Sequence, residues 1–97
     1  MNKEEFLIYC LLYAVDAAGV KKQNLVQMSL KTDAVVFVKI YNVIQQQDEA
    51  ARKSLLDSML KSFNKNEIIE DMKNTFLLDM DPSLQENIID VINQNPS

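Results

Sequence analysis

The stretch DMDPSLQEN, residues 79–87, places oxygen-bearing side chains at every second position. These oxygens belong to Asp79, Asp81, Ser83, Gln85 and Asn87, and Asp90 follows shortly after. Such a run could hold a hard cation, because Ca²⁺ prefers several oxygen ligands, as in the EF-hand loop. Three positions depart from that loop: Leu84 replaces its turn glycine, Glu86 replaces an apolar residue, and Asp90 is shorter than its closing glutamate.

The same residues are those expected where a helix begins. Asp81 suits the N-cap, and Pro82 suits the first helical position, where its missing N–H costs nothing. Leu84, Ile88 and Val91 would then share one buried face at helical spacing. A helix beginning after Asp81 therefore explains this stretch better than an EF-hand.

A weaker metal hypothesis remains beside the helix start. The carboxylates of Asp79, Asp81 and Glu86 could converge on one divalent cation at the corner before this last helix. The nearby helix N-terminus would oppose a cation there, because its partial charge is positive. No other cofactor is suggested by the sequence.

Catalysis is the least favoured class of function. The chain contains no His, which removes the commonest general base and a common metal ligand. Its single cysteine, Cys10, lies in an apolar run and is expected to be a buried, inert thiol. We also find no Gly-rich phosphate loop and no nucleophile–base pair, so we assign no catalytic residues.

Charge is divided unevenly along the chain. Residues 1–65 carry a net charge of +2, whereas residues 66–97 carry −6, for a total of −4. An acidic surface of this kind favours a basic protein partner and repels nucleic acid phosphates. The candidate partner-binding residues are Glu67, Glu70, Asp71, Asp79, Asp81 and Glu86.

Length and composition favour one all-α domain spanning residues 1–97. One Gly and two Pro argue for helices joined by short loops. We expect a compact bundle of five or six helices around a central apolar helix over residues 3–18, which Gly19 ends in a left-handed conformation. The other helices are expected over residues 22–30, 33–47 and 48–63, then from residue 66 to about 76, and after Asp81.

Two boundaries and one element rest on weaker signals. Thr32 is the expected cap of the third helix, and NKN, residues 64–66, is the expected connector before the fifth. The run VVFVKIYNVI, residues 35–44, is rich in β-branched residues, which also suits a buried strand. Its helical spacing and the lack of any partner strand favour a helix.

Two segments align without gaps, AVDAAGVKKQNLVQM at residues 14–28 and LLDMDPSLQENIIDV at residues 77–91. Each is expected to contain the end of an apolar helix, an acidic corner and the opening of a further helix. Asp16 matches Asp79, and Asn24 matches Asn87. If the match reflects a repeat, it implies two helix–corner–helix units related by a pseudo-twofold axis.

This layout resembles the tellurite-resistance TerB-like family of small helical bacterial domains. The segment FLLDMDPSLQEN looks like the family's acidic corner, with Asp79, Asp81 and Glu86 in the acidic places. The corner AVDAAGVKKQN of the first half keeps Asp16 and Gly19 but departs from the pattern, with Gln23 and Asn24 where acid is expected. The resemblance implies a non-enzymatic stress-response module that works in larger complexes. It also implies a divalent-metal site made by both halves, which the departure puts in question.

The expected function is therefore that of an acidic helical module that binds proteins. The alternative is an immunity or inhibitor protein that neutralises a basic partner, such as a toxin nuclease. Tyr9, Tyr13 and Tyr41 are candidate anchors, although burial is favoured for each. The apolar run at residues 6–15 is too short to span a bilayer, and we expect a cytoplasmic protein. The oligomeric state is left open.

Overall fold

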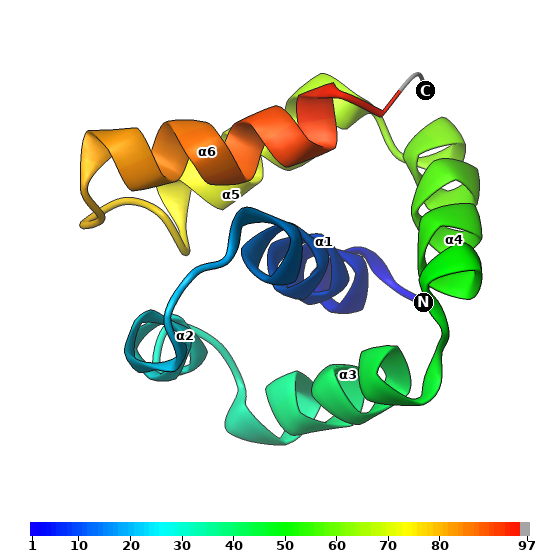
Figure 1. Cartoon of the computed structure of the whole chain (residues 1–97), viewed down its shortest axis with the longest axis horizontal. Coiled ribbons are helices and arrows are strands. Elements are labelled where there is room, and N and C mark those ends of the chain that lie inside the picture. Colours follow the sequence, from blue (N-terminus) through cyan, green and yellow to red (C-terminus); the bar gives the residue numbers. More distant parts are fainter. Residues whose placement is uncertain (96–97) are drawn as a thin grey trace.

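The computed structural model describes residues 1–95 and shows six helices there, with no strand (Figure 1). Their bounds are α1 Lys3–Ala18, α2 Lys22–Ser29, α3 Ala34–Gln46, α4 Glu49–Ser62, α5 Lys65–Asn74 and α6 Pro82–Asn93. The all-α prediction is confirmed. The strand alternative for residues 35–44 is wrong, since this run forms most of α3.

Helix α1 forms the centre of the molecule. Its buried residues are Phe6, Ile8, Tyr9, Cys10, Leu11, Leu12, Ala14 and Val15, which lie on every side of the helix. A helix that is apolar all round must be covered on all faces. Four helices do this by direct packing, namely α3, α4, α5 and α6.

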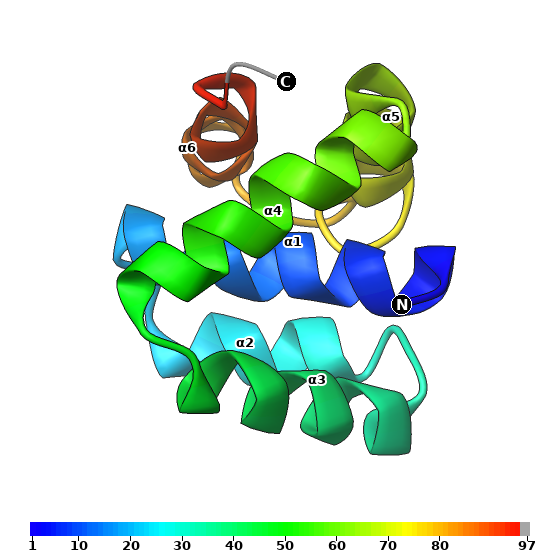
Figure 2. The ribbon, with the colours of Figure 1, turned by 90° about the vertical axis from the view of Figure 1, so that its right-hand side faces the viewer.

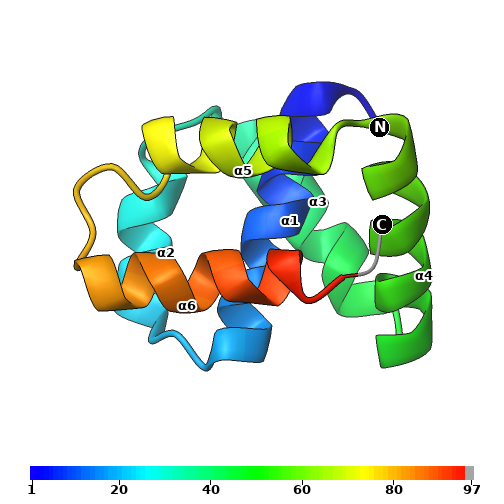
Figure 3. The same cartoon turned by 90° about the horizontal axis from the view of Figure 1, so that it is seen from above.

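The other helices form two pairs on opposite sides of α1, and a fifth helix runs across the end of both pairs. Helices α5 and α6 lie antiparallel on one side of α1, whereas α2 and α3 lie on the opposite side (Figures 1 and 3). Helix α4 runs across the end of this stack and links the two pairs, as Figure 2 shows. The Cα radius of gyration is 12.1 Å, close to the value expected for a folded domain of this length.

Local side-chain caps set the beginning of five helices. In each case a side-chain oxygen accepts a hydrogen bond from a backbone N–H of the first turn, which satisfies an otherwise unpaired donor. The capping residues are Asn2, Asp33, Asp48, Asn64 and Asp81. Helix α2 differs, since its N-cap residue, Lys21, makes no such bond.

Several sequence predictions are confirmed at helix ends and two are wrong. Gly19 adopts the left-handed conformation after α1, and Pro82 opens α6 behind its Asp81 cap. Asp33, rather than Thr32, caps α3, because its carboxylate accepts from the N–H groups of Val35 and Val36. Residues 64–66 are not a connector, since Asn64 caps α5 and the helix begins at the next residue.

The two segments proposed as a repeat differ at their corners. Asp16 lies inside α1, and three residues separate α1 from α2. Its counterpart Asp79 lies outside any helix, in the longer connection over residues 75–81. Buried Phe76 and Leu77 tie that connection to the core. The local geometry of the two corners is thus not repeated.

The end of the described chain is packed rather than projecting. Asn95 is buried, and its side-chain amide donates to the Asp57 carboxylate of α4. Its carbonyl oxygen accepts from Lys65 Nζ of α5 at 2.6 Å. These contacts hold the segment after α6 against α4 and α5.

The position of α1 can be tested with two matched substitutions. Leu11 is fully buried in α1, whereas Leu30 at the end of α2 is 80% exposed. Leu11→Ala should lower the free energy of unfolding by about 2–5 kcal/mol, because it leaves a cavity in the core. Leu30→Ala removes the same atoms and should change it by less than about 0.5 kcal/mol.

Urea denaturation followed by far-UV circular dichroism measures both values. Equal effects of the two substitutions would contradict the central placement of α1.

Candidate functional site

Two of the predicted acidic residues, Glu67 and Asp71, form ion pairs with a lysine of α1. The carboxylates of Glu67 and Asp71, one turn apart on α5, lie 2.8 and 2.9 Å from Lys3 Nζ. Hydrogen bonds to these two carboxylates raise the pKa of Lys3. Exposed ion pairs of this kind contribute little stability, but they show that part of the acidic surface is neutralised within the chain.

The remaining predicted residues are spread over the α5–α6 corner and α6. Asp79 lies 3.5 Å from Lys31 Nζ. The Asp81 carboxylate accepts from the Ser83 N–H as the cap of α6. Glu70 and Glu86 are exposed, the latter beside Lys73 in a shallow hollow. The structure therefore places the six residues on one side of the molecule without gathering them at one point.

The predicted convergence of Asp79, Asp81 and Glu86 on a cation is not seen. Within residues 1–95, no group of three or more His, Cys, Asp or Glu side chains is placed to hold a metal ion. The physical reason lies in their local roles. Asp79 points to Lys31, Asp81 is used by the helix start, and Glu86 lies further along α6.

A different surface carries most of the exposed apolar side chains. Seven large hydrophobic residues are exposed in residues 1–95, and five of them lie on α2, α3 or the turn between them. They are Leu30 (80% exposed), Val35 (79%), Val26 (62%), Val38 (56%) and Tyr41 (37%). We call these five residues the α2–α3 surface.

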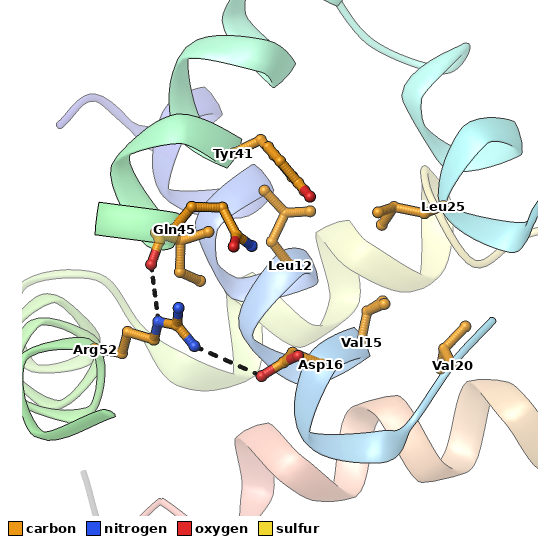
Figure 4. A pocket seen from close by; sticks show the side chains of 9 residues that line it. Leu12, Val15, Asp16, Val20, Leu25, Tyr41, Gln45 and Arg52 are labelled. Carbon is orange, nitrogen blue, oxygen red and sulfur yellow. Dashed lines mark hydrogen bonds and ion pairs between the residues drawn. The ribbon is translucent and has the colours of Figure 1, made fainter. Parts of the chain in front are cut away.

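The α2–α3 surface is hollowed between its two helices. One hollow of about 370 Å³ is lined by Leu25, Val26 and Ser29 of α2 and by Ala34, Phe37, Val38 and Tyr41 of α3. A second hollow of about 310 Å³ shares Leu25 and Tyr41 with it and continues to Ile44, Gln45 and Arg52. We call the two hollows together the trough; α2 and α3 line the first, whereas Leu12, Val15 and Asp16 of α1 line much of the second. Figure 4 shows the second hollow, with Tyr41 above Leu12 and Leu25 to the right of both.

Arg52 closes one end of the trough and joins three helices. Its Nε donates to the Ile44 carbonyl at the end of α3 at 2.8 Å, and its Nη1 lies 3.7 Å from Asp16 Oδ2 of α1 (Figure 4). The Tyr9 hydroxyl donates to Gln47 Oε1 at 2.7 Å and lies 3.3 Å from the Arg52 carbonyl oxygen. The polar groups at this end of the trough thus serve the junction of α1, α3 and α4.

Sequence reasoning missed the α2–α3 surface, because it favoured burial for Tyr41 and identified none of the other four residues as exposed. Tyr41 was expected to be buried and is exposed, whereas Tyr9 is buried as expected. One signal was present. Residues 35–44 are apolar on more than one helical face, yet only the central helix can be covered all round. A second such helix must leave apolar side chains at the surface.

The thiol of Cys10 offers no reactive site. It is fully buried in α1, as predicted, and burial raises its pKa well above the usual range. A thiol is a poor nucleophile in that state, because the thiolate is the reactive form.

Comparisons with protein-family models, curated proteins and solved structures return no match to this chain. The TerB-like resemblance accordingly stays a prediction. Within residues 1–95, each helix is too short or too polar to cross a bilayer.

The buried Tyr9 phenol predicts how stability depends on pH. Burial raises the pKa of Tyr9 to about 12, from a value near 10 in an unfolded chain. The neutral phenol thus favours the folded state below about pH 10, and this contribution is lost as the pH rises toward about 12. The free energy of unfolding should therefore fall across this range.

The matched variant is Tyr9→Phe. It should be less stable near neutral pH by about 0.5–1.5 kcal/mol, because the hydrogen bond to Gln47 is lost. Its stability should then fall less steeply above pH 10 than that of the parent chain, measured by urea denaturation at a series of pH values. Identical slopes would contradict the assignment to Tyr9.

Proposed function

We propose that the chain is a non-enzymatic binding module that acts on protein partners through the α2–α3 surface. The observation that carries the proposal is the hollow between α2 and α3, which three of the exposed large apolar side chains line, namely Val26, Val38 and Tyr41. Contiguous exposed apolar surface on a folded domain is typical of interaction sites, whereas single scattered residues need no explanation.

The shape and composition of the surface support protein recognition. Tyr41 presents an aromatic ring with a polar tip, a residue type that is enriched among binding hot spots. Val26 and Val38 lie on either side of the hollow, where a partner side chain would be removed from water. Burying such surface favours association in proportion to the apolar area covered.

The acidic side of α5 and α6 supports a second candidate function, an inhibitor that covers a basic partner. Glu70 and Glu86 are exposed on these helices, and the side chain of Glu67 is 62% exposed despite its contact with Lys3. Charge at an interface accelerates association more than it adds affinity. We rank this candidate below the first, because part of the acidic charge is neutralised within the chain.

A stress-response role, as the TerB-like resemblance implies, and a cytoplasmic location complete the proposal. Both stay predictions that depend on the identity of the partner.

Site-specific photo-crosslinking in the source cell tests which surface is used. A photoreactive amino acid at Gln45, which lines the trough, should capture the same protein repeatedly, whereas one at exposed Ser58 of α4 should not. The double variant Val35→Gln, Val38→Gln removes apolar contact without changing charge. It should reduce the adduct at least about tenfold, the loss expected when hot-spot side chains are removed.

The matched control is Glu67→Gln, Glu70→Gln, Glu86→Gln, which alters the acidic side and should leave the adduct unchanged. An adduct that is lost in the glutamate variant and kept in the valine variant would overturn the proposal in favour of the inhibitor. Failure to obtain any position-dependent adduct at Gln45 would also overturn it.

A further inference from the structure

We infer that the second hollow, beside Arg52, binds a free α-amino acid with an apolar side chain. We call it the Arg52 hollow. The inference goes beyond the proposed function and does not depend on it. It is carried by the lining of this hollow, which has a pair of opposite charges at one end and aliphatic side chains over much of the rest.

The Arg52 hollow lies where four helices meet. Leu12, Val15 and Asp16 are at i, i+3 and i+4 of α1, so they share one face of that helix. Helix α3 lines the hollow with three residues at the same spacing, α2 contributes Leu25, and α4 contributes Arg52. The volume of about 310 Å³ is at the lower end of the range of small-molecule sites, about 300–1,000 Å³. This size suits a ligand no larger than one amino acid.

Much of the lining is aliphatic. Figure 4 shows Val20 and Leu25 at the right of the hollow, away from Arg52 at its left. An apolar side chain of a ligand placed among such residues leaves water, and its binding is favoured in proportion to the area that it buries. The aliphatic lining residues are Leu12, Val15, Val20, Leu25 and Ile44.

The opposite end holds a guanidinium with unused donors. The Arg52 side chain is only 23% exposed, and its Nε donates to the Ile44 carbonyl oxygen at 2.8 Å. Its two Nη atoms carry four further N–H groups, and among residues 1–95 these make no hydrogen bond. Asp16 Oδ2 lies 3.7 Å from Nη1, which is too far for one. A planar carboxylate is the group that such a pair of donors binds best.

Asp16 determines the second charge of the ligand. Its side chain is 78% exposed beside Arg52, so a simple anion bound to Arg52 would meet a like charge. Glu49, which lines an adjoining hollow together with Arg52, adds to that repulsion. A simple cation bound to Asp16 would meet the guanidinium in the same way. A ligand that carries both charges avoids both repulsions.

The spacing of the two charges fits an α-amino acid. Its nitrogen and its carboxylate carbon are about 2.5 Å apart, because two bonds join them. The carboxylate can therefore contact Arg52 while the ammonium contacts Asp16, across the 3.7 Å that separates the two side chains. The four charges then alternate in sign, and each contact is a charge-assisted hydrogen bond.

Two other hollows lack this combination. The hollow between α2 and α3 has no charged residue in its lining. The hollow on α4 is lined by Lys53, Asp57 and Lys61, but Ala50 is the one apolar residue in its lining. Opposite charges and an aliphatic lining thus meet beside Arg52 and not at these two places.

Titration of the full chain with three ligands of the same shape tests the inference. L-Leucine carries both charges, 4-methylpentanoate carries only the carboxylate, and 3-methylbutylamine carries only the ammonium. In an isotope-labelled sample, leucine should cause saturable shifts of the Val15, Val20 and Leu25 methyl groups, but not of Ile88 or Ile92 in α6. It should bind at least about tenfold more tightly than either analogue, because each analogue lacks one charge-assisted contact. Glycine, which has no apolar side chain, should also bind at least about tenfold more weakly.

Matched variants assign the two charges. Asp16→Asn changes an exposed side chain and should abolish the advantage of leucine over 4-methylpentanoate, while circular dichroism shows an unchanged fold. Arg52→Gln should abolish the advantage of leucine over 3-methylbutylamine. Because Arg52 also joins α3 to α4, Asp16→Asn decides the test if Arg52→Gln does not fold. Glu70→Gln removes a carboxylate from an exposed position of α5 and should change neither affinity.

Three titration results would overturn the inference: no saturable shift with leucine, equal affinities for the three ligands, or shifts spread over α5 and α6. An advantage of leucine over 4-methylpentanoate that survives Asp16→Asn would overturn it as well. Each of these results would leave the proposed function intact, because the crosslinking experiment at Gln45 tests the protein partner separately.

Discussion

The burial of α1 on all sides is the constraint on which the rest of the structure depends. A helix with no face toward water can exist only if each neighbouring helix supplies an apolar face at the right place. It also requires each polar group that it carries inside to find a partner. The Tyr9 hydroxyl meets this requirement through Gln47, and no buried side-chain nitrogen or oxygen among residues 1–95 is left without one.

The two helix pairs satisfy this constraint differently, and the difference produces the contrast between the two sides of the molecule. On α6, Ile88 and Ile92 turn to the core, and polar residues occupy much of the outside. On α3, Phe37, Ile40 and Ile44 already suffice to cover α1, so Val35 and Val38 have no core to fill. Acid is concentrated on the first side and lysine on the second. An asymmetric distribution of apolar residues therefore coincides with an asymmetric distribution of charge.

Much of the fold could be predicted because helix boundaries depend on neighbours in sequence. Asp81 and Gly19 act within one turn of their own position, and each was identified from the sequence. The prediction that Thr32 caps α3 was wrong by one residue. Both Thr32 and Asp33 have side chains that can cap a helix, and only the backbone geometry distinguishes them. The exposure of Val35 and the pairing of Lys3 with Glu67 depend on residues far away in sequence, which local patterns do not specify.

The missing cap of α2 has a consequence for how the molecule moves. This helix has eight residues, Met28 is the one buried residue among those of α2 whose exposure the structure describes, and its N-cap residue Lys21 makes no side-chain hydrogen bond to the first turn. Short helices with few buried contacts open locally at a lower free energy than the rest of a domain. Amide protons of α2 should accordingly exchange with solvent well before those of α1. Since Leu25, Val26 and Ser29 of α2 line the hollow against α3, local opening of α2 would change the width of that hollow while α1 stays packed in the core.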